Sequence, residues 1–124
     1  TPSWDEIVQF ESAIEADNAL AGALKYVTTP AVKGKMKVTP KAANQAIFIS
    51  DGNTTNGYPL LTSTQLTTHT ILFGDWSQIM VGFWGVMEVR PDDATHAASA
   101  GLILRVFQDC DVAIRHAEAF AKST

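Results

Sequence analysis

The feature that most constrains the fold is a change in the spacing of apolar residues along the chain. At the start, Trp4, Ile7 and Ile14 follow helical spacing, and Ser3 with Glu6 forms the S-x-x-E capping box that begins a helix. Further along, short runs of β-branched and aromatic residues are separated by glycine and proline, the pattern of strands joined by turns. The order helix, strand, helix and then mostly strands predicts an α+β domain, with a mixed or antiparallel central sheet and flanking helices.

The individual elements follow from the same signals. Expected helices cover residues 3–16 and 30–38, and expected strands cover residues 25–29, 46–50, 58–62, 70–73 and 102–114. Pro59 has no N–H to donate, so its strand is expected at a sheet edge. Glycines within residues 79–89 indicate a hairpin or a bulged strand pair. The central sheet is expected to contain residues 47–49, 71–73 and a strand within 79–89, with the 30–38 helix packed on it.

Size and charge exclude several classes of protein. The 124 residues are enough for one domain, and a start at Thr1 without an initiator Met indicates a piece of a longer protein or a processed product. A net charge of −4 argues against nucleic-acid binding through phosphate contacts, which needs clustered lysine and arginine. Apolar runs never approach the ~18 residues of a membrane span. The single cysteine, Cys110, excludes an internal disulfide and a cysteine-based zinc cluster.

For each candidate catalytic or metal-binding residue, a structural role is the interpretation that the sequence favours. The three histidines are scattered without metal-ligand spacing, so no metal is expected. Asp109 and Asp111 flank Cys110, where we expect a buried thiol between solvated or arginine-paired acids rather than a cation site. Ser77 follows Asp75 without the glycines of a nucleophile elbow, so we expect a turn capped by Asp75. The sequence therefore predicts neither a catalytic residue nor a cofactor site.

Large apolar side chains are crowded into one stretch of the chain. Trp76, Phe83, Trp84 and Met87 lie within 12 residues, which is more than one face of a short hairpin can bury. The aromatic residues among them, with Tyr58, lack the interleaved basic residues that a base-stacking platform needs. We therefore predict that some of these side chains, with Phe83 and Trp84 as the candidates, contact a neighbouring subunit or an upstream part of a longer protein.

Three segments together resemble a known family. They read Asn56-Gly-Tyr-Pro-Leu-Leu, then Ile71-Leu-Phe-Gly-Asp-Trp-Ser-Gln, then a Leu104-Arg-Val run continuing to Asp111-Val-Ala-Ile-Arg-His-Ala-Glu-Ala-Phe. In this order and spacing, the segments resemble the C-terminal part of tailed-phage major capsid proteins with the Hong Kong 97-type fold. The matching positions are Gly57, Tyr58, Pro59, Phe73, Gly74, Asp75, Trp76, Arg105, Asp111, Arg115 and Phe120. Ala117 departs from the family, since many members carry proline there.

The resemblance implies a structural subunit of a phage or prophage icosahedral shell, and not an enzyme. Residues 19–107 would form most of the axial domain, and residues 1–18 and 108–124 would be segments of the peripheral domain. The implied partners are other copies of the chain, in pentamers and hexamers that enclose the DNA genome, without sequence-specific nucleic-acid or membrane binding. The implied location is the virion, assembled in the cytoplasm of the bacterial host. The isopeptide cross-link of some members is not carried over, because the matching region holds Ala100 and Phe107.

Two other functions stay open on the sequence alone. An encapsulin-like bacterial compartment shell protein shares the same fold and differs by a cargo-docking surface that the sequence does not show. A small hydrolase or ligand-binding domain belongs to a different class, and a ligand-binding domain would gain thermal stability from a metabolite.

Overall fold

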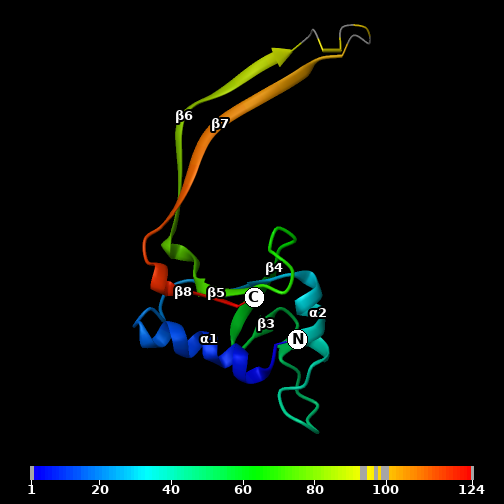
Figure 1. Cartoon of the computed structure of the whole chain (residues 1–124), viewed down its shortest axis with the longest axis vertical. Helices are drawn as coiled ribbons and strands as arrows, with labels where there is room; N and C mark the ends of the chain where they lie inside the picture. Colours follow the sequence, from blue (N-terminus) through cyan, green and yellow to red (C-terminus); the bar gives the residue numbers. More distant parts are fainter. Residues whose placement is uncertain (1, 93–94, 97, 99–100, 124) are drawn as a thin grey trace. The chain divides into compact units, whose positions relative to one another are not determined.

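The chain divides into two compact units, which are described separately (Figure 1). The computed structural model describes residues 2–92, 95–96, 98 and 101–123. Unit 1 comprises Thr1–Gln78 and His116–Thr124, and unit 2 comprises Ile79–Arg115. Ala100, named above for the cross-link, lies outside the described residues. Within the described ranges, none of the helices is both long and apolar enough to cross a membrane.

Unit 1 is built on a six-stranded mixed sheet. Its elements are α1 (Trp4–Ala16), β1 (Leu24–Thr28), α2 (Pro30–Val38), β2 (Ser50–Asp51), β3 (Thr54–Thr55), β4 (Tyr58–Thr62), β5 (Ile71–Asp75), η1 (Trp76–Gln78), η3 (Ala117–Ala119) and β8 (Phe120–Ser123). The strand order is β2-β3-β4-β1-β5-β8. Strands β1 and β4 are parallel, while the other neighbouring strands are antiparallel. This architecture confirms the predicted α+β class.

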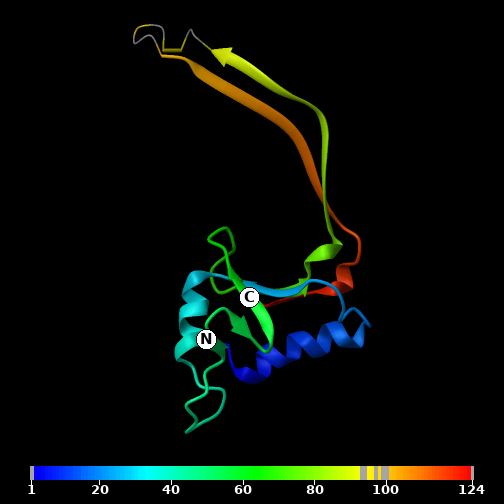
Figure 2. The ribbon, with the colours of Figure 1, turned by 180° about the vertical axis from the view of Figure 1, so that it is seen from behind.

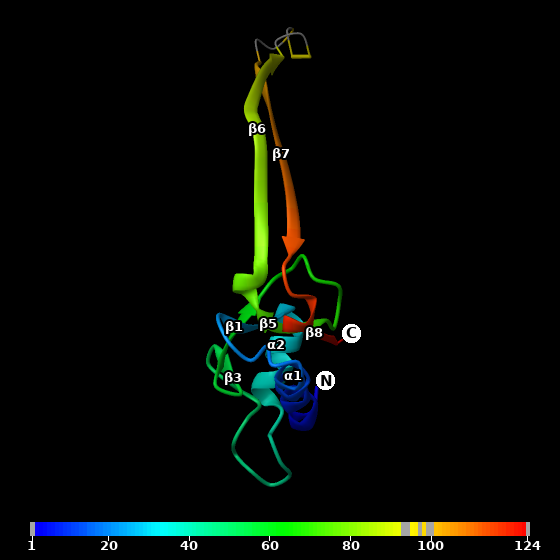
Figure 3. The ribbon, with the colours of Figure 1, turned by 90° about the vertical axis from the view of Figure 1, so that its left-hand side faces the viewer.

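Both expected helices are present and each buries one apolar face. The Ser3 and Glu6 side chains form the reciprocal capping box at the start of α1, and this helix lies against β5 and β8 (Figures 1 and 3). Helix α2 begins at Pro30, where the missing N–H costs no helical hydrogen bond. Val32 and Met36 on α2 are buried in the core of unit 1, so this helix packs as predicted.

Tyr26 of β1 is at the centre of the core. Its ring is fully buried and stacks on Phe73 of β5, with 4.1 Å between ring centroids. The Tyr26 hydroxyl donates to the Ile7 carbonyl of α1 at 3.0 Å, so the buried polar group keeps a partner. Sheet and helix are therefore joined through one side chain.

The expected strand at residues 46–50 is wrong. Phe48 forms an isolated bridge with Pro40, the Ile49 N–H donates to the Thr39 carbonyl at 3.0 Å, and the sheet begins only at β2. The backbone just after α2 takes these hydrogen bonds, which leaves no ladder to extend. Ile49 is still buried in the core, whereas Ile47 is exposed.

The predicted edge position of the Pro59 strand is also wrong, because β4 lies between β3 and β1. Pro59 is opposite Thr54 of β3. Pairing with β1 begins one residue later, at Leu60 opposite Tyr26. Proline is tolerated in this interior strand because it precedes the parallel ladder.

Unit 2 is a two-stranded antiparallel sheet of β6 (Ile79–Asp92) and β7 (Ile103–Ile114) (Figures 2 and 3). The long strand expected at 102–114 is confirmed. The strand within 79–89 exists but pairs only with β7 among the described residues, so its expected place in the central sheet is wrong. The alternative of a hairpin confined to 79–89 is wrong as well, since β6 continues to Asp92.

Candidate functional site

The β6–β7 sheet exposes apolar side chains over most of its length. At ~3.3 Å per residue, the 14 residues of β6 extend about 45 Å. Phe83 is 69% exposed and Trp84 is 55% exposed. This exposure is expected for side chains that become buried when a partner binds. The other large apolar residues exposed on β6 and β7 are Met80, Val81, Val86, Met87, Val89, Leu104, Val106, Phe107, Val112 and Ile114. A two-stranded sheet is marginally stable alone in water, so this surface is the strongest candidate for burial against another chain segment.

A bulge interrupts the register of this sheet near the two aromatic residues. Trp84 is opposite Asp109 and Glu88 is opposite Phe107, so three residues of β6 span one residue of β7. Gly85 begins the bulge with φ of +76°, a left-handed conformation that favours glycine. Val86 is 92% exposed as a result. The sequence indicated this bulge through Gly85.

The ion pairs found in the described part of unit 2 lie near the Asp92 end of β6 and the Ile103 end of β7. Arg90 donates to Glu88 at 2.8 Å, and Arg105 donates to Asp92 at 2.8 Å. The Arg90 guanidinium also lies 5.7 Å from the Phe107 ring centroid. These exposed ion pairs contribute about 0–1 kcal/mol each, so they do not replace a core.

The family-matched residues of unit 2 lie on exposed parts of the chain. Asp111 accepts a hydrogen bond from the neighbouring Val112 N–H at 2.8 Å, and both Arg115 and Arg105 are exposed. Cys110 is exposed too, so the expected burial of its thiol is wrong. The reason is that unit 2 has no second layer among the described residues to cover either face of β7.

In unit 1, the family-matched Tyr58 connects the sheet to α1. Its hydroxyl donates to Glu11 at 2.8 Å, and Asn56 donates to the other oxygen of the same carboxylate at 2.6 Å. The hydrogen bond to Glu11, reinforced by burial and by the charge of that carboxylate, raises the pKa of Tyr58. Gly57 completes the turn with a positive φ. Sequence reasoning missed Glu11, because helical spacing placed it on the polar side of α1.

Asp75 at the end of β5 is a buried carboxylate that organises three chain segments. One of its oxygens accepts from the Ala23 N–H at 2.8 Å and from the Ser77 N–H at 3.0 Å. The Ser77 hydroxyl donates to both oxygens, and Gln78 donates to the second at 3.0 Å. Burial alone would raise the pKa of Asp75, but these hydrogen bonds outweigh it and lower the pKa from 3.8 to about 2. The predicted turn capped by Asp75 is confirmed, and Ser77 acts there as a donor.

Gly74 and Trp76, which flank Asp75, pack against the returning C-terminal segment. A Cβ on Gly74 would overlap the Phe120 ring and the Ala119 carbonyl oxygen, so glycine is required for this close approach. The Trp76 and Phe120 rings meet edge to face at 5.8 Å. The Trp76 indole N–H donates to the Lys25 carbonyl at 3.0 Å. These matched positions therefore help to hold the sheet of unit 1 together.

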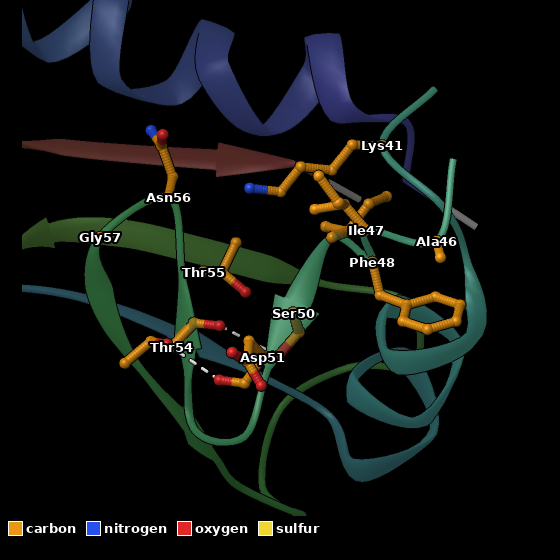
Figure 4. Close-up of a pocket in the computed structure, with 11 residues that line it drawn as sticks. Lys41, Ala46, Ile47, Phe48, Ser50, Asp51, Thr54, Thr55, Asn56 and Gly57 are labelled. Carbon is orange, nitrogen blue, oxygen red and sulfur yellow. Dashed lines mark hydrogen bonds between the residues drawn. The ribbon is translucent and has the colours of Figure 1, made fainter. Parts of the chain in front are cut away.

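A cavity of about 430 Å³ lies beside β2 and β3 (Figure 4). Hydrogen bonds from Ser50 to the Thr54 carbonyl and from Thr54 to the Asp51 carbonyl shape its wall. Lys41 and Asp51 are the ionisable residues that line it. The described residues contain no cluster of three metal-ligating side chains. This cavity supports no assignment of catalysis or metal binding.

Comparisons with known proteins agree on one family. The phage capsid family matches residues 1–124. The chain is 42% identical over 118 residues to the major capsid protein of Halomonas phage phiHAP-1, covering 95% of this chain and 20% of that protein. A solved structure described as the capsid of an empty GTA particle matches with a TM-score of 0.68 and 17% identity. That match covers 94% of this chain and 42% of the other, so the chain spans only part of both relatives.

Proposed function

The chain belongs to the phage capsid family, and from this membership we propose that it forms part of the structural subunit of a phage or prophage icosahedral shell. The expected resemblance to tailed-phage major capsid proteins of the Hong Kong 97 type is confirmed. Because the chain spans a fifth of its phage relative, the assembly and partners of the whole protein are part of this proposal.

The observation that carries the proposal is the apolar surface of the β6–β7 sheet. Both strands expose large side chains along their length, and burying such a side chain fully is worth about 1.5–3 kcal/mol. A subunit that assembles gains this free energy when other segments cover the sheet. Phe83 and Trp84, beside the bulge, are the contacts we assign first to a neighbouring subunit.

The finer assignments follow the family. Subunits associate as pentamers and hexamers, and the shell encloses the DNA genome in a virion assembled in the bacterial cytoplasm. Residues 19–107 belong to the axial domain, with residues 1–18 and 108–124 in the peripheral domain. The network around Asp75, Gly74 and Trp76 keeps the sheet rigid, and the chain has no catalytic role.

Hydrodynamic measurement on the full-length protein that contains this chain tests the proposal. The unsubstituted protein should sediment as rings and shells, whereas Phe83→Ser with Trp84→Ser should remain dissociated at the same concentration. The matched control, Ile47→Ser with Leu61→Ser, removes two large exposed side chains from unit 1 and should still assemble. If the Phe83/Trp84 variant assembled as well as the unsubstituted protein, unit 2 could not be part of the assembly surface. A full-length protein that never assembles would contradict the shell role itself.

A further inference from the structure

Charge is strongly separated within unit 1. Residues 1–17 contain five acidic and no basic side chains, while residues 18–50 contain five lysines and no acidic side chain. None of the ion pairs found in the described part of the chain involves these lysines. Lys33 donates to Asn53 and Lys41 lies over the Trp4 ring, whereas Lys35 and Lys37 are exposed on α2 and can contact a neighbouring copy.

Helix α2 presents a lysine-flanked face to solvent. Val32 and Met36 point into the core, which directs Gly34 and Val38 outward at helical spacing. Val38 is 72% exposed. Lys35 and Lys37, both exposed, lie on the two flanks of this outward stripe. We call Gly34, Lys35, Lys37 and Val38 the α2 face.

Gly34 has no role that the described residues explain. It lies inside α2, where glycine is less favourable than alanine. A Cβ built on Gly34 meets no atom within 4 Å, and its φ is not positive. Neither packing nor backbone conformation within the subunit requires glycine, which suits a position where another chain approaches the helix closely.

The C-terminal end of α1 carries the complementary charge. Glu15 and Asp17 are exposed there, and the last turn contains no basic residue. Acidic side chains at this end add to the negative pole of the helix dipole, an arrangement that is unfavourable without a cation. Asp17 also lines a cavity of about 160 Å³ with Gln78, which is room for the end of a lysine side chain. We call Glu15 and Asp17 the acidic end.

Helix α2 and the C-terminal end of α1 lie on opposite sides of unit 1 (Figures 1 and 2). Two different complementary surfaces on opposite sides of one subunit make a head-to-tail contact, which closes into a ring when the rotation between copies allows it. We propose that the α2 face of one copy docks against the acidic end of α1 in a second copy, with Lys35 and Lys37 near Glu15 and Asp17. This proposal rests on the proposed shell function and assigns the contact within a ring to these residues.

Charge reversal in the full-length protein tests the contact. Glu15→Lys with Asp17→Lys should raise the critical concentration for assembly at least about tenfold, since attraction becomes repulsion. The same change should leave the dissociated subunit at least as stable against unfolding as the unsubstituted subunit, because positive charges interact favourably with the C-terminal end of a helix dipole. Adding Lys35→Glu with Lys37→Glu restores complementarity and the original net charge, and should recover assembly. The single control Lys122→Glu, on the exposed part of β8, should assemble normally.

Substitution of Gly34 provides an independent readout. Gly34→Ala should raise the Tm of the dissociated subunit by about 2–5 °C, and Gly34→Gln should block assembly without unfolding the chain. Normal assembly of Gly34→Gln, or of the Glu15/Asp17 variant, would overturn the proposed contact while the unsubstituted protein still forms shells. Absence of assembly in the unsubstituted protein would instead overturn the shell function on which the contact rests.

Discussion

Lowering the pH should destabilise unit 1 through one carboxylate, Asp75. Its pKa falls from 3.8 to about 2 in the folded chain, a difference worth about 2 kcal/mol at ~1.36 kcal/mol per pH unit. Because the folded-state pKa lies below the unfolded value, the folded chain holds fewer protons. This stability is therefore fully present above about pH 4 and is lost as the pH falls toward about 2.

Thermal unfolding followed between pH 6 and pH 2, for the unsubstituted chain and for Asp75→Asn, measures this contribution. At pH 6 the variant should unfold about 8 °C lower, since ~1 kcal/mol corresponds to roughly 4 °C for a domain of this size. The Ser77 hydroxyl and the Gln78 amide donate hydrogen bonds to the Asp75 carboxylate. The N–H groups of an asparagine amide cannot accept them, so the variant loses part of these hydrogen bonds. On acidification the two unfolding temperatures should converge, because Asp75 loses its contribution as it becomes protonated, while the other carboxyl groups titrate in both proteins alike. A constant difference down to pH 2 would refute the assignment of this stability to Asp75.

Three further outcomes follow from the structure. Gly74→Ala should cost about 2–3 kcal/mol in thermal unfolding, because its Cβ overlaps Phe120 and the Ala119 carbonyl; an unchanged Tm would contradict that packing. Ser3→Ala should lower the free energy of unfolding by about 1 kcal/mol in chemical denaturation, because it removes the capping hydrogen bond from the Glu6 N–H. Ser3→Thr should retain most of this free energy. The 124-residue chain alone should sediment as a monomer or weak associate at micromolar concentration, because a contact under ~1,000 Å² rarely persists alone; a stable hexamer would show that this part alone drives ring formation.

Local signals predicted both helices of unit 1 and its strands β1, β4 and β5. The capping box at Ser3 and proline at the start of α2 depend only on neighbouring residues, and both helices begin where those signals are. The capped turn at Asp75 was predicted for the same reason. Elements set by short-range hydrogen bonds could be read without knowing the rest of the chain.

Pairing between distant strands could not be predicted in the same way. The Pro59 strand is interior because a two-residue strand, β3, pairs on one side of it, while pairing with β1 on its other side begins only after the proline. Residues 79–89 have the composition of a central strand, yet they pair only with β7 within the described chain. Burial of Cys110 was predicted from residue type, and its exposure arises because no second layer covers β7 among the described residues. In each case the outcome depends on which surface a remote segment covers.

Electron microscopy of the full-length protein expressed alone tests the shell function most directly. The account predicts closed icosahedral shells in which unit 1 recurs around fivefold and sixfold axes and the β6–β7 surface, Phe83 and Trp84 included, is covered by other segments. A protein that stays monomeric under all assembly conditions, or forms shells in which Phe83 and Trp84 remain exposed to solvent, would contradict it.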